Sequence, residues 1–526
     1  MGELTWSVGA PGLTAFDRCG IGAMAATIHA ARQDDVDLAP LDASFNQDSV
    51  VLRWPDDVSA RDGLVKLIEF AWQARQPTSS DGLGVLYLPA IHRGSAKDAY
   101  PDRLLENNGI LSTFLQHPRS QPKTKPPTHR QIEFEENRSV EVRFVESKKT
   151  LKYVTDFSGK LFCAKGKPKA RVKLAQYIMP GGTARHGGEK SWTGSAIRAL
   201  PLFFAPIGCF FLRAQQLSWV VVLPDVADLV AFARVRPLVR VGWKDAEVRS
   251  LEDAGLRIAV AYRARAATRR LALRGIEVLR VGRVEWNRQT VRSHFCRLQP
   301  EVEELDEFEK VLLYLTNRYR SRKTGEGAFI SVPTPRGRIA ANLAHGHYWY
   351  RSLFDVPKED REEVKKASQP NESAERAWFR LVGYERRALT AIAQELPVDA
   401  DRELDRVFQH AIHEAMARRF RQEAEYAERG ARSKKDRWED FRESSRRLFS
   451  RSNTRSTLRT AAAGFFADAG GSPTLRENAQ AIWTFIDSPA TWRRARDLAL
   501  FSLVTYEGRA ELAPGEGKAG NAHQSD

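Results

Sequence analysis

The sequence contains little cysteine, and its four cysteines are not closely spaced. Cys19, Cys163, Cys209 and Cys296 are scattered over 526 residues, and no Cys-x-x-Cys motif occurs. This spacing argues against a zinc site built from cysteine pairs and against a disulfide framework. We therefore expect reduced thiols in a cytoplasmic protein.

The chain also lacks a long uninterrupted apolar run. The most apolar segment, residues 199–212, contains Pro201 and Pro206. It is shorter than the roughly 20 residues that a membrane-spanning helix needs. The first ten residues have no basic stretch followed by an apolar core, so we expect no secretory signal. Both patterns predict a soluble, cytoplasmic protein.

Recognisable catalytic and metal-binding motifs are missing. There is no His-Asp pair, no His-Glu-x-x-His motif and no run of spaced acids typical of a two-metal site. His410 and His413 are predicted to lie on the polar side of an amphipathic helix, without an obvious third ligand, so we interpret them as a surface pair. The sequence is typical of a binding protein rather than an enzyme, and we expect no metal and no other cofactor.

The glycine-rich segment 180–195 lacks the Gly-Lys-Ser/Thr ending of a Walker loop. Its five glycines let the backbone approach a ligand closely, and Arg185, His186 and Lys190 lie among them. We interpret it as a mobile loop that contacts DNA. An ordinary surface loop is the alternative.

What the chain does contain is positive charge. It has 82 basic and 66 acidic residues, a formal net charge of +16 and an isoelectric point near 9.7. This excess predicts a polyanionic partner, nucleic acid before an anionic membrane. A protein that is merely basic is the alternative. We favour nucleic acid and expect no membrane partner.

Three clusters carry the excess charge. Residues 148–173 hold nine basic residues and one acid, and residues 431–459 hold ten basic residues and four acids. Residues 256–274, predicted to form one helix with Arg263, Arg270 and Arg274 close to one face, hold six arginines and no acid. Such clusters bind a phosphate backbone by releasing counterions, although any one of them can be a solvated face. The predicted phosphate-binding residues are Lys165, Lys167, Lys169, Arg171, Lys173, Arg263, Arg270, Arg274, Lys434, Lys435, Arg446 and Arg447.

The hydrophobic pattern changes along the chain and predicts two kinds of domain. Residues 1–357 mix strand and helix periods, which predicts an α+β region with a mixed or antiparallel sheet. Residues 374–510 show helical periodicity alone and predict an all-α helical bundle. Residues 358–373 are predicted to be a linker and residues 511–526 a disordered tail. The expected strands include 4–8, 49–54, 83–91, 217–225 and 276–286, and the expected helices of the first region include 13–33, 58–76 and 102–116.

Residues 334–354 combine a short helix with an aromatic run. Thr334 and Pro335 are typical of a helix start, and Gly346 is typical of a helix end. At 100° per residue, three polar residues share one stripe of this helix. The stripe consists of Arg338, Asn342 and His345, and the aromatic run contains Tyr348, Trp349 and Tyr350.

Three blocks of the sequence resemble the large subunit of the type I CRISPR surveillance complex, Cascade, and most closely its DevT-like subtype. Residues 4–30 contain an Ala-Pro-Gly-Leu-Thr turn and a glycine-containing first helix. Residues 197–214 contain an apolar Pro-Ile-Gly-Cys segment, and residues 336–354 begin with Arg-Gly-Arg-Ile. The blocks follow the family's order, whereas the C-terminal helices match only in class.

The resemblance implies a non-catalytic subunit at the 5′ end of the guide RNA (crRNA). It implies recognition of the protospacer-adjacent motif in double-stranded target DNA, opening of the duplex and stabilisation of the R-loop. Base pairing then specifies most of the sequence and the protein recognises a short duplex element. The implied partners are the backbone and 5′-cap subunits, a helicase-nuclease, and a small subunit, which some complexes make from a start codon inside the large-subunit gene.

The resemblance also suggests roles for particular residues. The residues predicted to contact duplex DNA are Arg185, His186, Lys190, Arg338, Asn342 and His345. Tyr348, Trp349 and Tyr350 are candidates for stacking on a base or wedging the duplex open, since stacking contributes ~1–3 kcal/mol per base. For the helix the alternative is a purely structural cap, and for the aromatic residues it is burial in a core.

Three other interpretations stay open. The same subunit can belong to a transposon-encoded complex that recruits transposition proteins in place of the nuclease. A stand-alone metal-dependent nuclease belongs to a different class, as does a DNA-binding regulator that acts alone.

Overall fold

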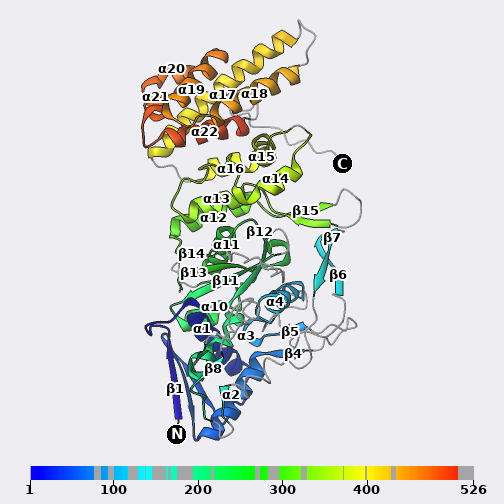
Figure 1. The fold of residues 1–526 in the computed structure, drawn as a ribbon, viewed down its shortest axis with the longest axis vertical. Helices are drawn as coiled ribbons and strands as arrows, with labels where there is room; N and C mark the ends of the chain where they lie inside the picture. Colours follow the sequence, from blue (N-terminus) through cyan, green and yellow to red (C-terminus); the bar gives the residue numbers. More distant parts are fainter. Residues whose placement is uncertain are drawn as a thin grey trace, which may run out of the picture. The chain divides into compact units, whose positions relative to one another are not determined.

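Figure 1 shows the computed structural model of the chain, which has two compact units, Met1–Gly346 and His347–Asp526. The structure describes residues 2–75, 85–92, 100–115, 128–136, 138–144, 161–163, 167–173, 193–214, 218–266, 273–281, 295–321, 328–370, 372–396, 400–427 and 434–506. The predicted boundary after residue 357 differs from the division at residue 346. The predicted tail, 511–526, lies outside the described residues.

The first unit starts with a small antiparallel sheet of β1 (Gly2–Ser7), β2 (Asp42–Phe45) and β3 (Ser49–Trp54) in the order β1-β3-β2. Between β1 and β2 runs α1 (Ala15–Gln33), whose first turn is closed by a capping box between Thr14 and Asp17. The predicted strand 49–54 and the predicted helix 13–33 are therefore confirmed.

The main sheet of this unit has five strands in the order β12-β10-β11-β13-β14. The pair β10–β12 is parallel and the other pairs are antiparallel, so the sheet is mixed, as predicted. Its central strand β11 has the sequence Ser-Trp-Val-Val-Val-Leu-Pro-Asp-Val and is almost wholly buried, because α1 and α11 both pack against it. The strands are β10 (Phe210–Ala214), β11 (Ser218–Val226), β12 (Glu247–Val248), β13 (Leu273–Val281) and β14 (Phe295–Leu298).

Helices and two-stranded ribbons surround the two sheets (Figure 1). The remaining helices are α2 (Asp57–Ala71), α3 (Pro89–His92), α4 (Tyr100–Thr113), α8 (Ala196–Leu202), α9 (Ala205–Gly208), α10 (Leu229–Val235), η2 (Trp243–Asp245), α11 (Leu251–Arg265), α12 (Val302–Tyr314) and α13 (Arg336–Ala344). The antiparallel ribbons pair β4 (Gln73–Arg75) with β5 (Val85–Tyr87), β6 (Thr128–Glu135) with β7 (Arg138–Phe144), β8 (Val172–Lys173) with β9 (Thr193–Gly194), and β15 (Arg318–Ser321) with β16 (Ala328–Ser331).

Close backbone packing joins the first two of the three family-like blocks. A Cβ atom on Gly20 of α1 would lie 2.3 Å from the carbonyl oxygen of Pro201 in α8. A Cβ atom on Gly208 of α9 would lie 2.6 Å from the Sγ of Cys19. Only glycine fits at either position, so the glycines of the two blocks are explained by contact between α1 and the buried apolar segment.

Three predictions about local structure were wrong. Residues 256–274 do not form one helix, because α11 ends at Arg265 and Leu273 already pairs with Val226 in β13. In the described part of the predicted strand 83–91, the strand covers only Val85–Tyr87, and the predicted helix 58–76 stops at Ala71. Strand pairing ends both predicted helices, because Leu273 pairs with Val226 and Gln73 pairs with Tyr87, whereas the predicted strand is cut short by helix α3 at Pro89.

The second unit contains only helices and turns in its described residues, which confirms the predicted all-α bundle. Its long helices α17, α18 and α22 pack against one another. The segment predicted to be a linker, 358–373, includes a short helix, α14. The helices are η3 (Lys358–Asp360), α14 (Arg361–Ala367), α15 (Ala374–Gly383), α16 (Arg386–Glu395), α17 (Ala400–Ala427), α18 (Lys434–Ser450), α19 (Arg455–Asp468), α20 (Pro473–Glu477), α21 (Ala479–Asp487) and α22 (Trp492–Thr505).

In the part of the chain that the structure describes, no helix combines the length and the apolar character that crossing a membrane requires.

Candidate nucleic-acid interface

The polar helix α13 is anchored by Arg336, which is fully buried. The Nε of Arg336 donates to Asp253 Oδ2 at 3.0 Å, and its Nη1 donates to Asn317 Oδ1 at 2.8 Å. Its two Nη groups also donate to the carbonyl oxygens of Leu315 and Glu247, each at 3.0 Å. Burial lowers the pKa of Arg336 to about 10, so the guanidinium remains charged at neutral pH.

The Asp253 carboxylate joins this network to the start of α11. It accepts a hydrogen bond from the backbone N–H of Arg249 at 2.8 Å, and Ser250 caps α11 by accepting from the N–H of Asp253. Gly337 lies so close to Arg249 that an added Cβ would be 2.6 Å from its Cγ. Arg336 and Gly337 therefore fix the N-terminal end of α13, and Arg338, the second arginine of the Arg-Gly-Arg sequence, follows them.

The predicted polar stripe of α13 divides into accessible and buried members. Arg338 is half-buried, and its Nε has no hydrogen-bond partner among the described residues. His345 is exposed at the C-terminal cap, just before Gly346 with a φ of +64°. Asn342 is only 6% exposed. Its burial favours the structural alternative for Asn342, whereas Arg338 and His345 remain accessible.

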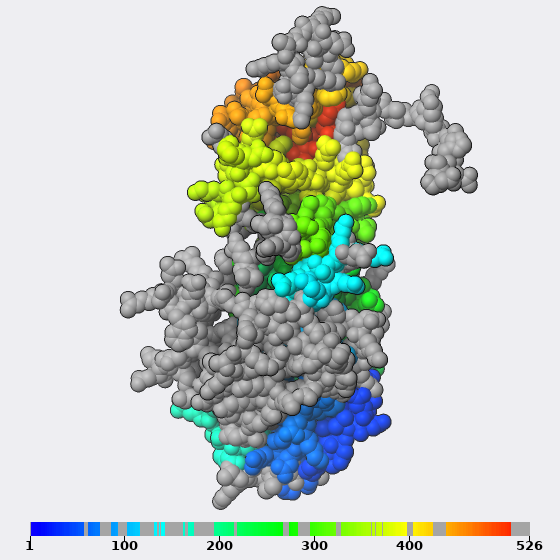
Figure 2. Space-filling model, turned by 90° about the vertical axis from the view of Figure 1, so that its right-hand side faces the viewer, coloured from blue at the N-terminus to red at the C-terminus, as the bar shows by residue number. Residues whose placement is uncertain are grey.

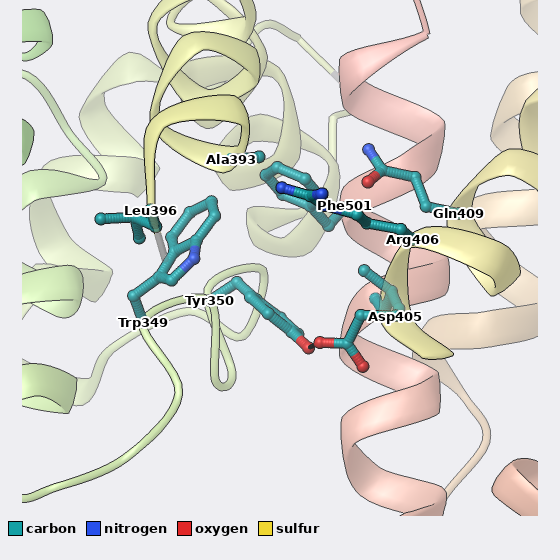
Figure 3. Close-up of a pocket in the computed structure, with 9 residues that line it drawn as sticks. Trp349, Tyr350, Ala393, Leu396, Asp405, Arg406, Gln409 and Phe501 are labelled. Carbon is teal, nitrogen blue, oxygen red and sulfur yellow. Dashed lines mark hydrogen bonds between the residues drawn. The ribbon is translucent and has the colours of Figure 1, made fainter. Parts of the chain in front are cut away.

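The aromatic run belongs to the second unit. Trp349 and Tyr350 are 4% and 5% exposed and pack against Phe501 of α22. Figure 3 shows the Tyr350 hydroxyl directed at the Asp405 carboxylate, to which it donates, and a small pocket lined by these residues. These placements favour the core alternative for the aromatic residues.

Tyr348, the first aromatic residue of the run, is half-buried, and it donates to Asp497 Oδ2 at 2.9 Å. The same carboxylate oxygen accepts from the N–H of Ser352 at 2.9 Å. Burial raises the pKa of Asp497 to about 6, and these two hydrogen bonds oppose the shift. Tyr348 thus holds its own loop onto α22 within the second unit.

The first basic cluster is only partly described. Lys167 and Arg171 are exposed and Lys169 is half-buried, while the side chain of Lys173 is not described. The Lys169 carbonyl accepts from the N–H of Ala196 at 3.0 Å, which places this segment beside the start of α8. Lys165 of this cluster lies outside the described residues, as do Arg185, His186 and Lys190 of the glycine-rich segment.

Three exposed arginines, Arg198, Arg274 and Arg297, lie near the Ala-Pro-Gly-Leu-Thr turn and the start of α1. We call these three residues the turn surface. Arg274 donates to the Val8 carbonyl at 3.2 Å. Arg297 reaches the fully buried carboxylate of Asp225 at 3.1 Å. Each arginine is thus fixed close to the family-like N-terminal block.

The rest of the turn surface is held by the same block. Arg198, whose side chain is 49% exposed, lies 3.8 Å from Asp17, and the neighbouring Ile197 carbonyl accepts from Trp6 Nε1. Arg18 of α1 also pairs with Asp225, and it donates to the Leu13 carbonyl at 2.8 Å. The charge count found Arg274 but missed Arg198 and Arg297, because both lie outside the dense clusters.

The predicted face of Arg263, Arg270 and Arg274 does not exist. Arg263 lies in α11 with its side chain 10% exposed, and its guanidinium pairs with Asp306 at 2.8 Å and Glu309 at 2.9 Å. Arg274 lies in β13, and Arg270 lies outside the described residues. Arg263 therefore fastens α11 to α12, and its charge is neutralised by two acids.

The basic cluster of the second unit is also partly engaged. Arg446 is 6% exposed, pairs with Glu443 at 2.8 Å and lies over the ring of Phe379. Arg447 is exposed but pairs with the same Glu443 at 2.9 Å. Lys434 and Lys435 begin α18, and their side chains are not described. Arg447 is the most accessible of the predicted residues whose side chains are described in this unit.

The prediction of a surface histidine pair was half wrong. His410 is exposed and lies 3.4 Å from Glu414, but His413 is 7% exposed and its Nε2 lies 3.0 Å from the Ser502 carbonyl. Among the described residues, no group of three His, Cys, Asp or Glu side chains is arranged to hold a metal ion.

Comparison with known proteins relates both ends of the chain to one family. Residues 5–203 match the DevT N-terminal domain, and residues 397–526 match the DevT C-terminal domain. The CRISPR-associated protein Cas8a1/Csx13 of Myxococcus xanthus (strain DK1622) is 26% identical over 547 residues, which cover 98% of this chain and 91% of that protein. The matched N-terminal domain contains α1, Arg198 and the contact between Gly20 and Pro201.

Proposed function

Because the chain belongs to the DevT family of type I CRISPR large subunits, we propose that it is the non-catalytic large subunit of an RNA-guided DNA-binding complex. In this role it recognises the protospacer-adjacent motif, helps to open the duplex, stabilises the R-loop and docks a downstream effector. Its partners are the guide RNA, the target DNA and the other subunits of the complex.

The observation that carries the proposal is the turn surface. Arg198, Arg274 and Arg297 are exposed. Arg198 and Arg274 contact the N-terminal block. Arg297 donates to Asp225 of β11, which also pairs with Arg18 of that block. Fixed, exposed guanidinium groups bind phosphates without selecting bases, and every phosphate contact adds to the salt dependence of binding. We propose that this surface binds the phosphate backbone of the target duplex or of the guide RNA.

The first test uses the complex assembled with guide RNA and a double variant, Arg198→Gln with Arg274→Gln. We expect weaker binding for every flanking sequence alike, and a slope of log Kd against log salt that is smaller by about 2. Arg53→Gln is the matched control, because Arg53 is also 49% exposed but is paired with Glu3 at 2.8 Å. An unchanged salt slope in the double variant would remove the turn surface from the interface.

For motif recognition we propose Arg338 and His345 on α13, together with Arg185, His186 and Lys190 of the glycine-rich segment. Arginine offers the paired donors that a base edge in the major groove accepts. The proposal leaves out Asn342, because its burial favours a structural role. Arg338→Gln is expected to weaken binding mainly for targets with the correct flank, and an equal loss for all flanks would make the helix structural.

The non-enzyme part of the proposal has its own test. The purified chain, incubated with Mg²⁺ or Mn²⁺ and labelled DNA or RNA, is expected to leave both intact. Reproducible cleavage that His410→Ala abolishes would favour the metal-dependent nuclease. Purification of the chain from its native cells is expected to bring guide RNA of uniform length, and its absence would favour a regulator that acts alone.

A further inference from the structure

The β15–β16 hairpin has two chemically different faces. Tyr319 pairs with Ile330, and Arg320 pairs directly with Phe329. Because side chains alternate between the faces of a ribbon, Tyr319, Ala328 and Ile330 share one face. That face packs against Val140 of β7, and the guanidinium of Arg138 lies 5.6 Å from the centre of the Tyr319 ring. Figure 2 shows the β6–β7 ribbon, coloured cyan, at the surface of the molecule.

The opposite face of the hairpin, which we call the outer face, carries Arg318, Arg320, Phe329 and Ser331. Arg320 is exposed, and Phe329 exposes 45% of its surface although an aromatic ring gains most by burial. Directly paired residues place their Cβ atoms about 4.5–5.5 Å apart, so the cation and the ring stand side by side.

The combination of an exposed ring and neighbouring arginines indicates which kind of ligand this face binds. The four residues of the outer face include two arginines and no acid, and positively charged groups of this kind attract the phosphates of a polyanionic ligand. Nucleobases stack on aromatic rings while neighbouring arginines hold the backbone phosphates. The bound strand must be unpaired at that point, because a base inside a duplex is already stacked on its neighbours and cannot stack on the ring.

We propose that the outer face of the β15–β16 hairpin binds single-stranded nucleic acid, with one base stacked on Phe329 and an adjacent phosphate on Arg320. The inference rests on the proposed function for the source of the strand, since opening a duplex on a guide RNA releases one DNA strand. The binding surface itself is argued from the hairpin alone.

The test uses the assembled complex and a fluorescently labelled oligo(dT) as the probe, with binding followed by anisotropy. Phe329→Ala is expected to weaken oligo(dT) binding about 5- to 150-fold, because a single stacking contact is lost. Phe329→Trp is expected to restore it. Arg320→Gln is expected to reduce the salt slope of binding by about 1.

Leu313→Ala is the matched control, because Leu313 of α12 is an apolar residue of the same unit with 68% exposure and no ring to stack on a base. It should bind oligo(dT) like the wild type. Photocrosslinking with an oligonucleotide that contains 5-bromodeoxyuridine is expected to attach the strand to the peptide that holds Phe329.

Two results would overturn the inference. Equal oligo(dT) affinity of Phe329→Ala and wild type, with guide RNA bound and duplex binding intact, would reject the hairpin and leave the proposed function standing. Loss of a protein subunit from the Phe329→Ala complex would identify a protein interface instead. A wild-type complex that contains no guide RNA and binds no target duplex would reject the proposed function, whatever the hairpin binds.

Discussion

Replacing Arg336 tests whether the buried network holds α13 in place. Arg336→Met keeps most of the side-chain volume but removes the charge and all the donors of the guanidinium. It leaves Asp253 as a carboxylate with 0% exposure, and it deprives Asn317 Oδ1 and two carbonyl oxygens of a donor.

The expected loss of stability is large. Breaking a buried ion pair by removing one partner costs about 3–5 kcal/mol, because a buried charge is left uncompensated. Asp253 keeps the backbone N–H of Arg249 as a donor, which places the expected value near the lower end, at about 3 kcal/mol. Asp253→Asn in the Arg336→Met background should cost little more, since the orphaned charge is then absent.

The assay is urea unfolding of the full chain, followed by the fluorescence of its tryptophans, several of which are buried in the first unit. The double-mutant cycle of Arg336→Met and Asp253→Asn isolates the pair. A cost below about 1 kcal/mol for the single variant, the range of a surface ion pair, or additive costs in the cycle would refute the reasoning.

Three further stability predictions follow from burial and close contact. The folded-state pKa of Asp497, about 6, exceeds its ordinary value, so its contribution to stability is present at low pH and is lost as pH rises through about 6. The stability of Asp497→Asn relative to wild type should therefore rise by about 3 kcal/mol between about pH 4 and pH 7 in urea titrations, and a flat difference would contradict this. Tyr262→Phe should change the unfolding free energy by less than about 1 kcal/mol or raise it, because the Tyr262 hydroxyl is fully buried without a hydrogen-bond partner among the described residues. Gly20→Ala should lower the melting temperature, since its Cβ would lie 2.3 Å from the Pro201 carbonyl, whereas Gly464→Ala, with no atom within 4 Å, should stabilise α19 by about 0.5–1 kcal/mol in thermal unfolding.

Much of the fold was predictable because its elements are consistent with their local sequence. The helix predicted from Pro335 and Gly346 runs from Arg336 to Ala344, and the alternating segment 49–54 is a strand of the same length. The failure at 256–274 has a physical cause. That segment is locally helical, but its second half supplies the start of β13, whose pairing with β11 depends on residues about fifty positions earlier.

The candidate site was less predictable, because a sequence shows charges but not their partners. Arg263, Arg336 and Arg446 were indistinguishable from surface arginines until acids such as Asp253 were found beside them. For Arg336 and Asp253 the partners are 83 positions apart. The exposed Phe329 was missed for the opposite reason, since an apolar residue in a strand normally predicts a core position.

The placement of Trp349 and Tyr350 limits how the chain can be shortened. Both rings pack on Phe501, although they precede the predicted linker, 358–373. An internal start codon in that linker would produce the helical part of the protein alone. A product that starts there would carry α22 without the two rings that cover it, and it would expose Phe501 together with the Asp405 carboxylate that Tyr350 now satisfies. Such a shorter polypeptide needs another protein surface to replace those rings.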